Sequence, residues 1–209
     1  MISDYKLSFT SASLFVNETI RVAELFTLNH DWDLCRQILI KENLIQKKKE
    51  RTIIRQFQEI RHRLKSLTNA QLELLVDSNI ETQKLIIFLG VCNVYSFICE
   101  FVTEVLRQKY ILFDNYLTES DYNRFYEYKA ANSQKLSSIS DNTKVKIKRV
   151  TFTILWQSGL INSVKDRIIT QPFLTPKLIE VVVQENPELL KVFLVSDTDI
   201  KNYIEKYGK

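Results

Sequence analysis

The sequence is poor in the residues that build turns and flexible loops. Its 209 residues include only three glycines and three prolines. β-Hairpin turns, glycine-rich phosphate loops and flexible linkers depend on these residues, so the sequence offers little material for any of them. Hydrophobic residues make up 45% of the chain, which is enough for a substantial core. Leucine, isoleucine, lysine and glutamate are plentiful, and this composition predicts an all-α globular fold.

Cysteine is also scarce, and its pattern argues against a disulfide scaffold. The three cysteines are an odd number, and Cys92 and Cys99 fall seven residues apart in one predicted helix, too far along its axis to be bridged. With Cys35 they indicate a reduced, cytoplasmic setting. The N-terminal segment shows neither a secretory signal nor a lipidation motif.

Long hydrophobic runs are missing as well. The most apolar stretch, Leu85 to Cys99, is about 15 residues or roughly 22 Å of helix, against about 30 Å of membrane hydrocarbon. It also contains Asn93 and Ser96. The helical stripe continues to about Tyr110, so the pattern predicts one long central helix in the core of a multi-helix bundle, with no membrane partner.

The sequence has few residues for catalysis or metal binding. It has two histidines, no paired cysteine or Cys-His metal spacing, no phosphate-binding glycine loop and no nucleophile elbow. Glu100 and Glu104 share a helix face but lack the Glu-x-x-His pattern of a di-iron site, so we expect a solvated or ion-paired edge. We therefore predict a protein that is not an enzyme and holds neither metal nor cofactor.

What the sequence does have is a concentrated basic segment. Residues 41–65 hold nine lysines or arginines against three glutamates, a charge of +6, whereas the whole chain carries only +4. If Glu50 to Lys65 is a helix, one face is apolar and comprises Ile53, Phe57, Ile60 and Leu64. The opposite face is basic and polar and comprises Arg51, Arg55, Gln58, His62 and Lys65. One face is expected to dock on the core and the other to meet an anion.

The basic face has two interpretations. Most runs of lysine and arginine are simply solvated surfaces. However, Glu59 is the only acidic residue between Arg51 and Lys65, whereas surface helices usually mix the two signs. A one-sided row of cations can neutralise several DNA phosphates, and Gln58 and the arginines can reach base edges. The pattern favours contact with nucleic acid.

The other elements suggest two helical domains, 1–112 and 113–209, which could pack as one unit. A helix capped by Asp31 and running from Trp32 to Glu42 precedes the basic helix, and together they suggest a helix-turn-helix-like unit. In residues 144–154, lysines alternate as in a strand, but Ile147, Val150 and Ile154 fit a helix. Helix is preferred because Asp141 or Asn142 can cap its start and Gly159 can end it.

Two further features belong to the second domain. Residues 167–170 form a candidate short strand that pairs near Ile161, which predicts a small β-hairpin wing at residues 160–171 and a winged-helix-like element. In the helix opened by Thr118, Tyr122, Phe125, Tyr126 and Lys129 share a face. These aromatic rings are expected to pack in the core, although stacking on bases is the alternative.

Several segments together carry a family resemblance. They are YKLSFTSASLFVNE, DWDLCRQILIKENLIQ, RT…R…EIRHRL with its following LT, CNVYSFICEFVTEVLR, DYNRFYEYKA, NTKVKIKRVTFTILWQSGLI and QPFLT. In these segments the chain resembles the BrxA family, small accessory proteins of BREX bacteriophage-resistance systems that were once labelled inner-membrane proteins. The resemblance covers most of the chain but includes no catalytic signature.

The resemblance implies a nearly all-helical, cytoplasmic DNA-binding protein that acts beside ATPase, methyltransferase and phosphatase-like BREX components. The positions that match the family's basic stretch are Arg51, Thr52, Arg55, Arg61 and Arg63. The charge argument adds Lys47, Lys48, Lys49, Gln58, His62 and Lys65, and, in the second domain, Lys144, Lys146, Lys148 and Arg149. Lys47 to Lys49 match no family pattern.

The leading hypothesis is a non-enzymatic component that binds double-stranded DNA mainly through its phosphate backbone. The alternatives are a protein-interaction adaptor of the defence complex and a helical RNA-binding module.

Overall fold

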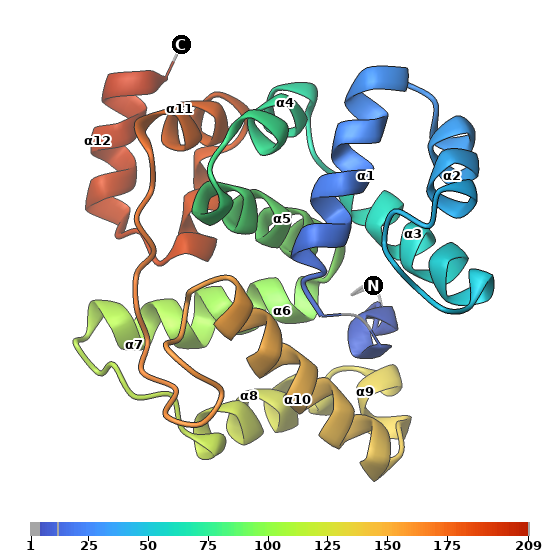
Figure 1. Cartoon of the computed structure of the whole chain (residues 1–209). Coiled ribbons are helices and arrows are strands. Elements are labelled where there is room, and N and C mark those ends of the chain that lie inside the picture. The colour runs from blue at the N-terminus through green and yellow to red at the C-terminus, as the bar shows by residue number, and fades with distance from the viewer. Residues whose placement is uncertain (1–4, 12, 209) are drawn as a thin grey trace. The chain divides into compact units, whose positions relative to one another are not determined.

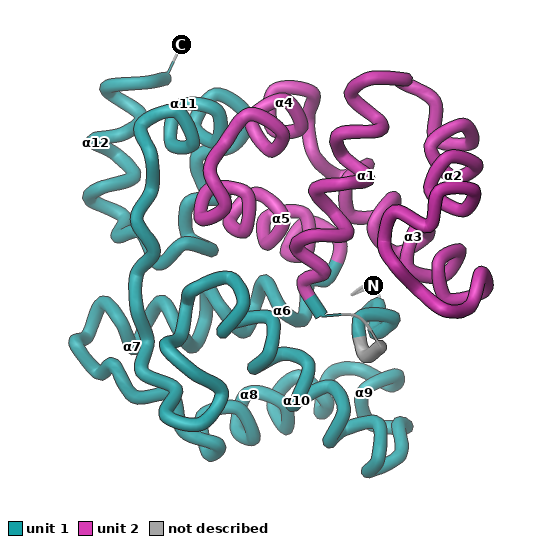
Figure 2. Tube along the Cα trace, in the orientation of Figure 1, with its two compact units in different colours: residues 1–13, 95–209 teal, residues 14–94 magenta. Residues whose placement is uncertain are grey.

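A computed structural model describes residues 5–11 and 13–208, and these form two compact units (Figure 2). Residues 14–94 make up one unit, here called the α3 unit. Residues 1–13 and 95–209 make up the other, here called the α10 unit. The chain thus divides between residues 94 and 95, whereas the sequence suggested a boundary between residues 112 and 113. Independent folding of either division stays a prediction.

The expected all-α fold is confirmed, because helices account for all the regular secondary structure in the described residues (Figure 1). The α3 unit is built from five helices. They are α1 (Val16–Asn29), α2 (Trp32–Lys41), α3 (Glu50–Leu64), α4 (Asn69–Asp77) and α5 (Ile80–Val94).

Local signals explain where helices of the α3 unit begin. The Asp31 carboxylate caps α2 by accepting hydrogen bonds from the backbone amides of Asp33 and Leu34, at 2.8 and 3.2 Å. Thr68 and Gln71 form the reciprocal capping box that starts α4. Helix α5 is buried over most of its length and packs against α1, α3 and α4, so it forms the core of this unit.

The α10 unit contains the remaining helices. They are the 3₁₀ turn η1 (Ser8–Ser11), α6 (Ser96–Phe101), the π-helical turn η2 (Val102–Leu106), α7 (Arg107–Ile111), α8 (Glu119–Ala131), α9 (Gln134–Ser138), α10 (Asp141–Gln157), α11 (Pro176–Glu185), the 3₁₀ helix η3 (Pro187–Phe193) and α12 (Asp197–Tyr207). Their core is aromatic: Phe97 and Phe101 of α6 contact Tyr122 and Phe125 of α8, with ring centroids 5.1–6.3 Å apart. Tyr122, Phe125 and Tyr126 of α8 are buried and therefore lie in the core, as the pattern favoured.

The predicted long central helix is wrong in one respect, because the chain leaves the helical conformation at Tyr95. Tyr95 has φ −119° and ψ 85°, and it separates α5 from α6. Its ring is fully buried against Phe9, and its hydroxyl lies 2.9 Å from Ser8 Oγ. The flanking residues Val94 and Ser96 are neither proline nor glycine, so no helix-breaking residue marks the position. Long-range packing of the tyrosine therefore decides it.

The ambiguous segment around residues 144–154 is helical. Helix α10 runs through it and buries Ile147, Val150 and Ile154, the positions that fitted a helix. Ser140 occupies the cap position, whereas Asp141 or Asn142 was expected to cap the helix. After the helix, Gly159 adopts φ +80°, which favours glycine, so the expected C-terminal stop is confirmed.

In place of the predicted β-hairpin wing, the structure has isolated β-bridges. In the part of the chain that is described, Ile161 forms one antiparallel bridge with Ile169, and Tyr116 forms another with Ile168, without a strand. The Asn162 side chain accepts a hydrogen bond from the Ile168 amide at 2.9 Å. This side-chain hydrogen bond stabilises a turn within the segment, where a hairpin would have a longer ladder of backbone hydrogen bonds.

None of the described helices is, by itself, long and apolar enough to cross a bilayer. The segments Ile80–Val94 and Ser96–Ile111 pass the length and composition test only when taken together, across the break between them.

Candidate nucleic-acid interface

Helix α3 has the two faces that the sequence predicts. Its apolar stripe is buried and comprises Ile53, Phe57, Ile60 and Leu64. Its opposite stripe is solvent-exposed and comprises Arg51, Arg55, Gln58, His62 and Lys65. Packing of the apolar stripe against α1, α2 and α5 holds the basic stripe facing outward. This exposed stripe is called the α3 basic face below.

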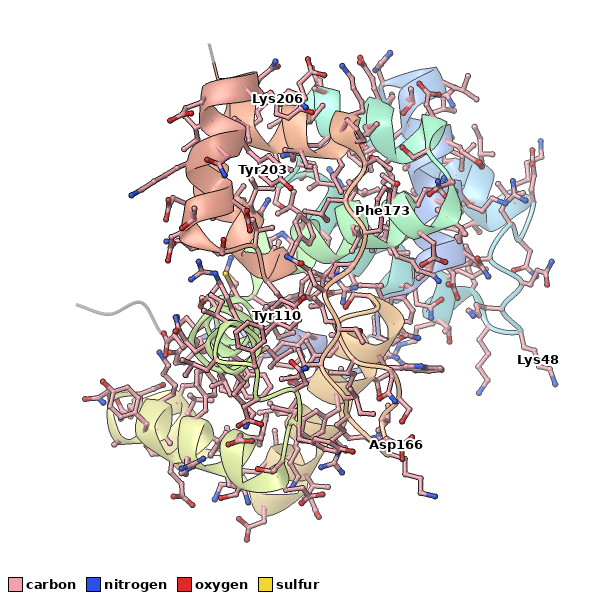
Figure 3. The ribbon with its side chains drawn as sticks, turned by 90° about the vertical axis from the view of Figure 1, so that its left-hand side faces the viewer. Lys48, Tyr110, Asp166, Phe173, Tyr203 and Lys206 are labelled. Carbon is pink, nitrogen blue, oxygen red and sulfur yellow. The ribbon has the colours of Figure 1, made fainter. Side chains whose placement is uncertain are left out.

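The arginines of the α3 basic face carry uncompensated charge. Within residues 5–11 and 13–208, neither Arg51 nor Arg55 forms an ion pair, and Lys48, Lys49 and Lys65 form none either. All five side chains are exposed. Lys48 extends away from the ribbon into solvent in Figure 3. The cations are therefore available to an external anion.

Arg63 has a different environment from the rest of the predicted site. Its side chain is only 1% exposed, and its Nε donates to Glu59 Oε1 at 2.8 Å. Its guanidinium also reaches the Leu14 carbonyl at 3.4 Å and lies 5.8 Å from the centre of the Phe15 ring. Arg63 thus joins α3 to the start of α1 and is not accessible to a ligand in this structure.

Lys47 is also partly occupied. Its Nζ donates to Glu18 Oε1 at 3.0 Å, which ties the α2–α3 connection to α1. The same connection is fixed by Asn43, whose side chain accepts from the Lys47 amide at 2.9 Å, and by the buried Ile45. The connection spans residues 42–49, longer than the three- or four-residue turn of a helix-turn-helix. A close match to that motif is absent at this connection, so the candidate site consists of the α3 basic face and Lys48 and Lys49.

Two other predicted residues lie at the edge of the face. Arg61 is half-buried, and its guanidinium carbon lies 5.9 Å from the centre of the Trp32 ring. Trp32 in turn stacks on Phe26 at 3.8 Å, so Arg61 rests on a supported aromatic platform. Thr52 is half-buried on the other side of α3.

The basic residues of α10 divide into two groups. Lys144 pairs with Asp141 at 3.0 Å, and Lys148 pairs with Glu119 of α8 at 2.8 Å. Lys146 and Arg149 are exposed, and neither has an ion-pair partner in the described part of the chain. Only Lys146 and Arg149 resemble the free cations of α3.

Sequence reasoning missed two exposed cations beside α3. Arg36 and Lys41 lie on α2, which packs against α3, and both are exposed. Their position is predictable, since Cys35 and Leu39 form the buried stripe of this amphipathic helix. The charge argument counted Lys41 within residues 41–65 but placed neither Arg36 nor Lys41 in the candidate site.

Glu100 and Glu104, the two glutamates that share a helix face, are both ion-paired. Glu100 and Glu104 both contact Lys129 Nζ, at 2.6 and 2.7 Å, and Glu100 also accepts from the Tyr5 hydroxyl. This is one of the two kinds of edge, solvated or ion-paired, that the sequence favoured. Over the residues that the structure describes, no group of three or more histidine, cysteine, aspartate or glutamate side chains is placed to hold a metal ion.

Comparison with known proteins places the chain in a family. The family model for BrxA matches residues 3–186. The chain belongs to the BrxA family. A BREX protein BrxA from Bacillus cereus (strain H3081.97) is 28% identical over 177 residues, which cover 84% of this chain and 88% of that protein. A solved structure has a similar fold: the crystal structure of an uncharacterized protein from Magnetospirillum magneticum has a TM-score of 0.78 at 18% identity, covering 91% of this chain and 97% of the other.

Proposed function

We propose that this BrxA-family chain is a non-enzymatic, DNA-binding component of a BREX phage-defence system. The α3 basic face, with Lys48 and Lys49 before it, is the main contact with duplex DNA, and Lys146 and Arg149 of α10 form a second contact. The observation that carries the proposal is that Arg51 and Arg55 are exposed on one face of α3 and have no acidic partner among the residues that the structure describes. The family membership supports the defence role, because a relative is named as a BREX protein.

The geometry of the α3 basic face suits contact with the phosphate backbone better than sequence-specific contact with base edges. Arginine and lysine side chains on one helical face can each neutralise a phosphate and release its counterion. Such contacts fix position but carry little sequence information. Gln58 lies within the same stripe and is exposed, so it is the side chain placed to contact a base edge. We therefore expect tight binding with a modest sequence preference.

The test is a salt titration of duplex DNA binding. With about six cations engaged, log affinity should fall against log salt concentration with a slope of roughly −5. The double variant Arg51→Gln and Arg55→Gln removes two phosphate contacts and should make the slope less negative by about 2. Arg51→Glu with Arg55→Glu should abolish detectable binding.

A matched control separates local contact from overall charge. Arg21→Glu with Lys84→Glu makes the same charge change in the same unit, on α1 and α5, where each residue pairs with a neighbouring glutamate on its own helix. This control should keep most duplex binding. If both double variants lose binding equally, or if the salt slope of the wild type is near zero, the α3 basic face is not the site.

A second candidate function is docking to another protein of the defence complex. Leu112 and Phe113 are adjacent at the end of α7 and are 74% and 89% exposed. Phe113 also has φ +59°, an unusual conformation for a bulky residue. An exposed apolar pair in this conformation favours a protein contact.

Variants of the two surfaces distinguish the two candidate functions. Leu112→Asp with Phe113→Asp should remove co-purification with BREX partner proteins while keeping duplex DNA binding, whereas the α3 variants should do the reverse. An RNA-binding role predicts instead that RNA hairpins or single strands outcompete duplex DNA at near-physiological salt. A competition titration with the three nucleic acids therefore ranks the alternatives.

A further inference from the structure

A groove lies between α12 and residues 171–174, the coil that leads into α11. Its volume is about 430 Å³. Residues 171–174 line one side, and Val195, Asp199 and Tyr203 line the other. In Figure 3, Phe173 on the coil and Tyr203 on α12 both lie on the side turned toward the viewer. This site, here called the α12 groove, belongs wholly to the α10 unit and includes none of the cations proposed to contact DNA.

The backbone of residues 171–174 is unpaired. Over the part of the chain that the structure describes, none of its amides or carbonyls forms a hydrogen bond with another protein group. Pairing ends just before the coil, where the Thr170 amide donates to the Leu160 carbonyl at 3.0 Å. It resumes just after the coil, where the Ile179 amide donates to the Thr175 carbonyl at 3.1 Å. Main-chain groups in this state are available to an added, extended peptide.

The coil is held in place by its side chains. Gln171 Nε2 donates to the Leu194 carbonyl at 3.2 Å, and Gln171 Oε1 accepts from the Tyr110 hydroxyl at 3.4 Å. The Thr170 hydroxyl donates to the Gly159 carbonyl at 2.8 Å. Because these contacts already fix the coil, a peptide that binds there has little ordering cost to overcome.

Two aromatic side chains border the α12 groove. Phe173 is 83% exposed although it is aromatic. Tyr203 is half-buried, and its ring centroid lies 6.5 Å from that of Tyr207 on the same helix. Exposed aromatic rings beside a groove are typical of protein-interaction surfaces. The faces of such rings also attract cations.

The charge of the α12 groove is negative, because Asp199 is the only charged residue among the described residues that line it. Asp199 Oδ2 accepts from the Ser196 hydroxyl at 2.6 Å, but no lysine or arginine in residues 5–11 and 13–208 forms an ion pair with it. Asp197 differs, since it pairs with Arg107 at 2.9 Å and with Lys191 at 3.5 Å. A cation therefore complements the groove, whereas the phosphates of a nucleic acid are repelled.

We propose that the α12 groove binds an extended, basic peptide segment of a partner protein. The backbone of the peptide pairs with residues 171–174. One of its arginine or lysine side chains lies against Phe173 and Tyr203 and forms an ion pair with Asp199. The site is separate from the α3 basic face and from the exposed apolar pair at the end of α7, and it depends on neither.

The first experiment titrates the whole chain with the peptide acetyl-Thr-Val-Arg-Val-Thr-amide and follows binding by NMR. Threonine and valine favour the extended conformation that the proposal requires. Binding should shift the ring resonances of Phe173 and Tyr203. A peptide with glutamate in place of the arginine should bind at least 10-fold more weakly. A peptide methylated on the amide nitrogens of both valines should bind at least 5-fold more weakly, because it lacks two backbone donors.

The second experiment changes the groove. Asp199→Asn and Phe173→Ala should each weaken binding of the arginine peptide about 3- to 10-fold. Asparagine can still accept from the Ser196 hydroxyl, and Phe173 is exposed, so both variants should fold like the wild type. Glu205→Gln makes the same charge change on the other side of α12, and Tyr128→Ala removes an exposed ring from α8, outside the groove. Both controls should bind the peptide like the wild type.

Several results would overturn the proposal. They are no binding of the arginine peptide, equal binding of the glutamate peptide, or unchanged affinity in both Asp199→Asn and Phe173→Ala. Displacement of the peptide by single-stranded DNA would identify a nucleic acid as the ligand. A wild-type dimer in sedimentation that Phe173→Ala dissociates would identify a second copy of the chain. Either result contradicts a peptide of a partner protein.

The peptide site and the proposed function are tested separately. The variant Arg51→Gln with Arg55→Gln should bind the arginine peptide like the wild type, because it leaves the α12 groove unchanged. Asp199→Asn should in turn bind duplex DNA like the wild type. Duplex binding that fails while peptide binding persists contradicts only the proposed function, and the reverse contradicts only the peptide site.

Discussion

Arg55 and Arg63 lie on the same helix in opposite environments. Arg55 is exposed on the α3 basic face, whereas Arg63 is buried against Glu59 and the Leu14 carbonyl. Removing one partner of a buried ion pair leaves the other without compensation, which typically costs about 3–5 kcal/mol. An exposed arginine without a partner contributes little to stability.

We therefore expect Arg63→Ala to lower the free energy of unfolding by about 3 kcal/mol and Arg55→Ala to lower it by less than about 0.5 kcal/mol. Urea denaturation measures both. Under conditions in which both variants are folded, Arg55→Ala should weaken duplex DNA binding. Arg63→Ala should keep most of its affinity for duplex DNA, because it leaves the exposed α3 cations in place. If the two variants had the same free energy of unfolding, the buried environment of Arg63 would be contradicted.

Asp121 is the residue for which the structure predicts a pH effect. Burial works to raise its pKa, but hydrogen bonds from Thr118 and ion pairs with Arg124 and Lys109 outweigh burial and lower the pKa to about 2. A carboxyl group with a lowered pKa in the folded state stabilises the protein above its unfolded pKa of 3.8. This contribution is lost as the pH falls through about 2.

Asp121→Asn should therefore reduce the free energy of unfolding by about 2 kcal/mol at pH 6, and the difference from the wild type should shrink as the pH approaches 2. Asparagine can still accept from the Thr118 amide, so the substitution isolates the charge. Urea midpoints at pH 6, 4 and 2.5 measure the effect. A difference that stays constant over this range would show that the carboxylate charge is not responsible.

At the scale of elements, periodicity predicts a helix face well but not the contacts at its edge. The buried and exposed stripes of α3 follow from side-chain spacing alone, and so do the capping signals of α2, α4 and α8. Arg63 lies beside the apolar stripe, and its burial depends on Leu14, 49 residues earlier. The break at Tyr95 likewise depends on a distant partner, Phe9. Neither contact can be predicted from the local sequence, because each partner lies far away in the chain.

The position of α3 depends on its close approach to α5 at Gly90. A Cβ built at Gly90 would lie 3.2 Å from the Arg63 carbonyl oxygen, which is backbone and cannot rotate away. Alanine gains about 1 kcal/mol of helix propensity over glycine, which offsets this crowding. Valine adds volume that the site cannot accept.

We expect Gly90→Ala to be close to the wild type in stability and Gly90→Val to be less stable by about 1–3 kcal/mol. Thermal unfolding measures the series. Because the displaced element carries the basic face, Gly90→Val should also weaken duplex binding under conditions in which the protein is folded. A valine variant as stable as the wild type would contradict the close approach.

At the scale of the whole molecule, the two possible divisions of the chain predict different behaviour for fragments. Residues 14–94 form one continuous segment with a buried core on α1, α2, α3 and α5. Residues 1–112 add α6 and α7 without α8 and α10. Phe97 and Phe101 would then lose their contacts with Tyr122, Phe125 and Phe152 and expose their rings.

We expect the fragment 14–94 to unfold in one cooperative urea transition and to bind duplex DNA. Arg51→Gln with Arg55→Gln, made in this fragment, should weaken that binding. The fragment 1–112 should bind a hydrophobic dye and aggregate, because its two phenylalanines expose apolar surface of the kind that drives association. If 1–112 is the soluble, cooperative fragment and 14–94 is unfolded, the division falls after α7. The aromatic core of α6 would then be complete without α8, which the ring contacts of Phe97 and Phe101 argue against.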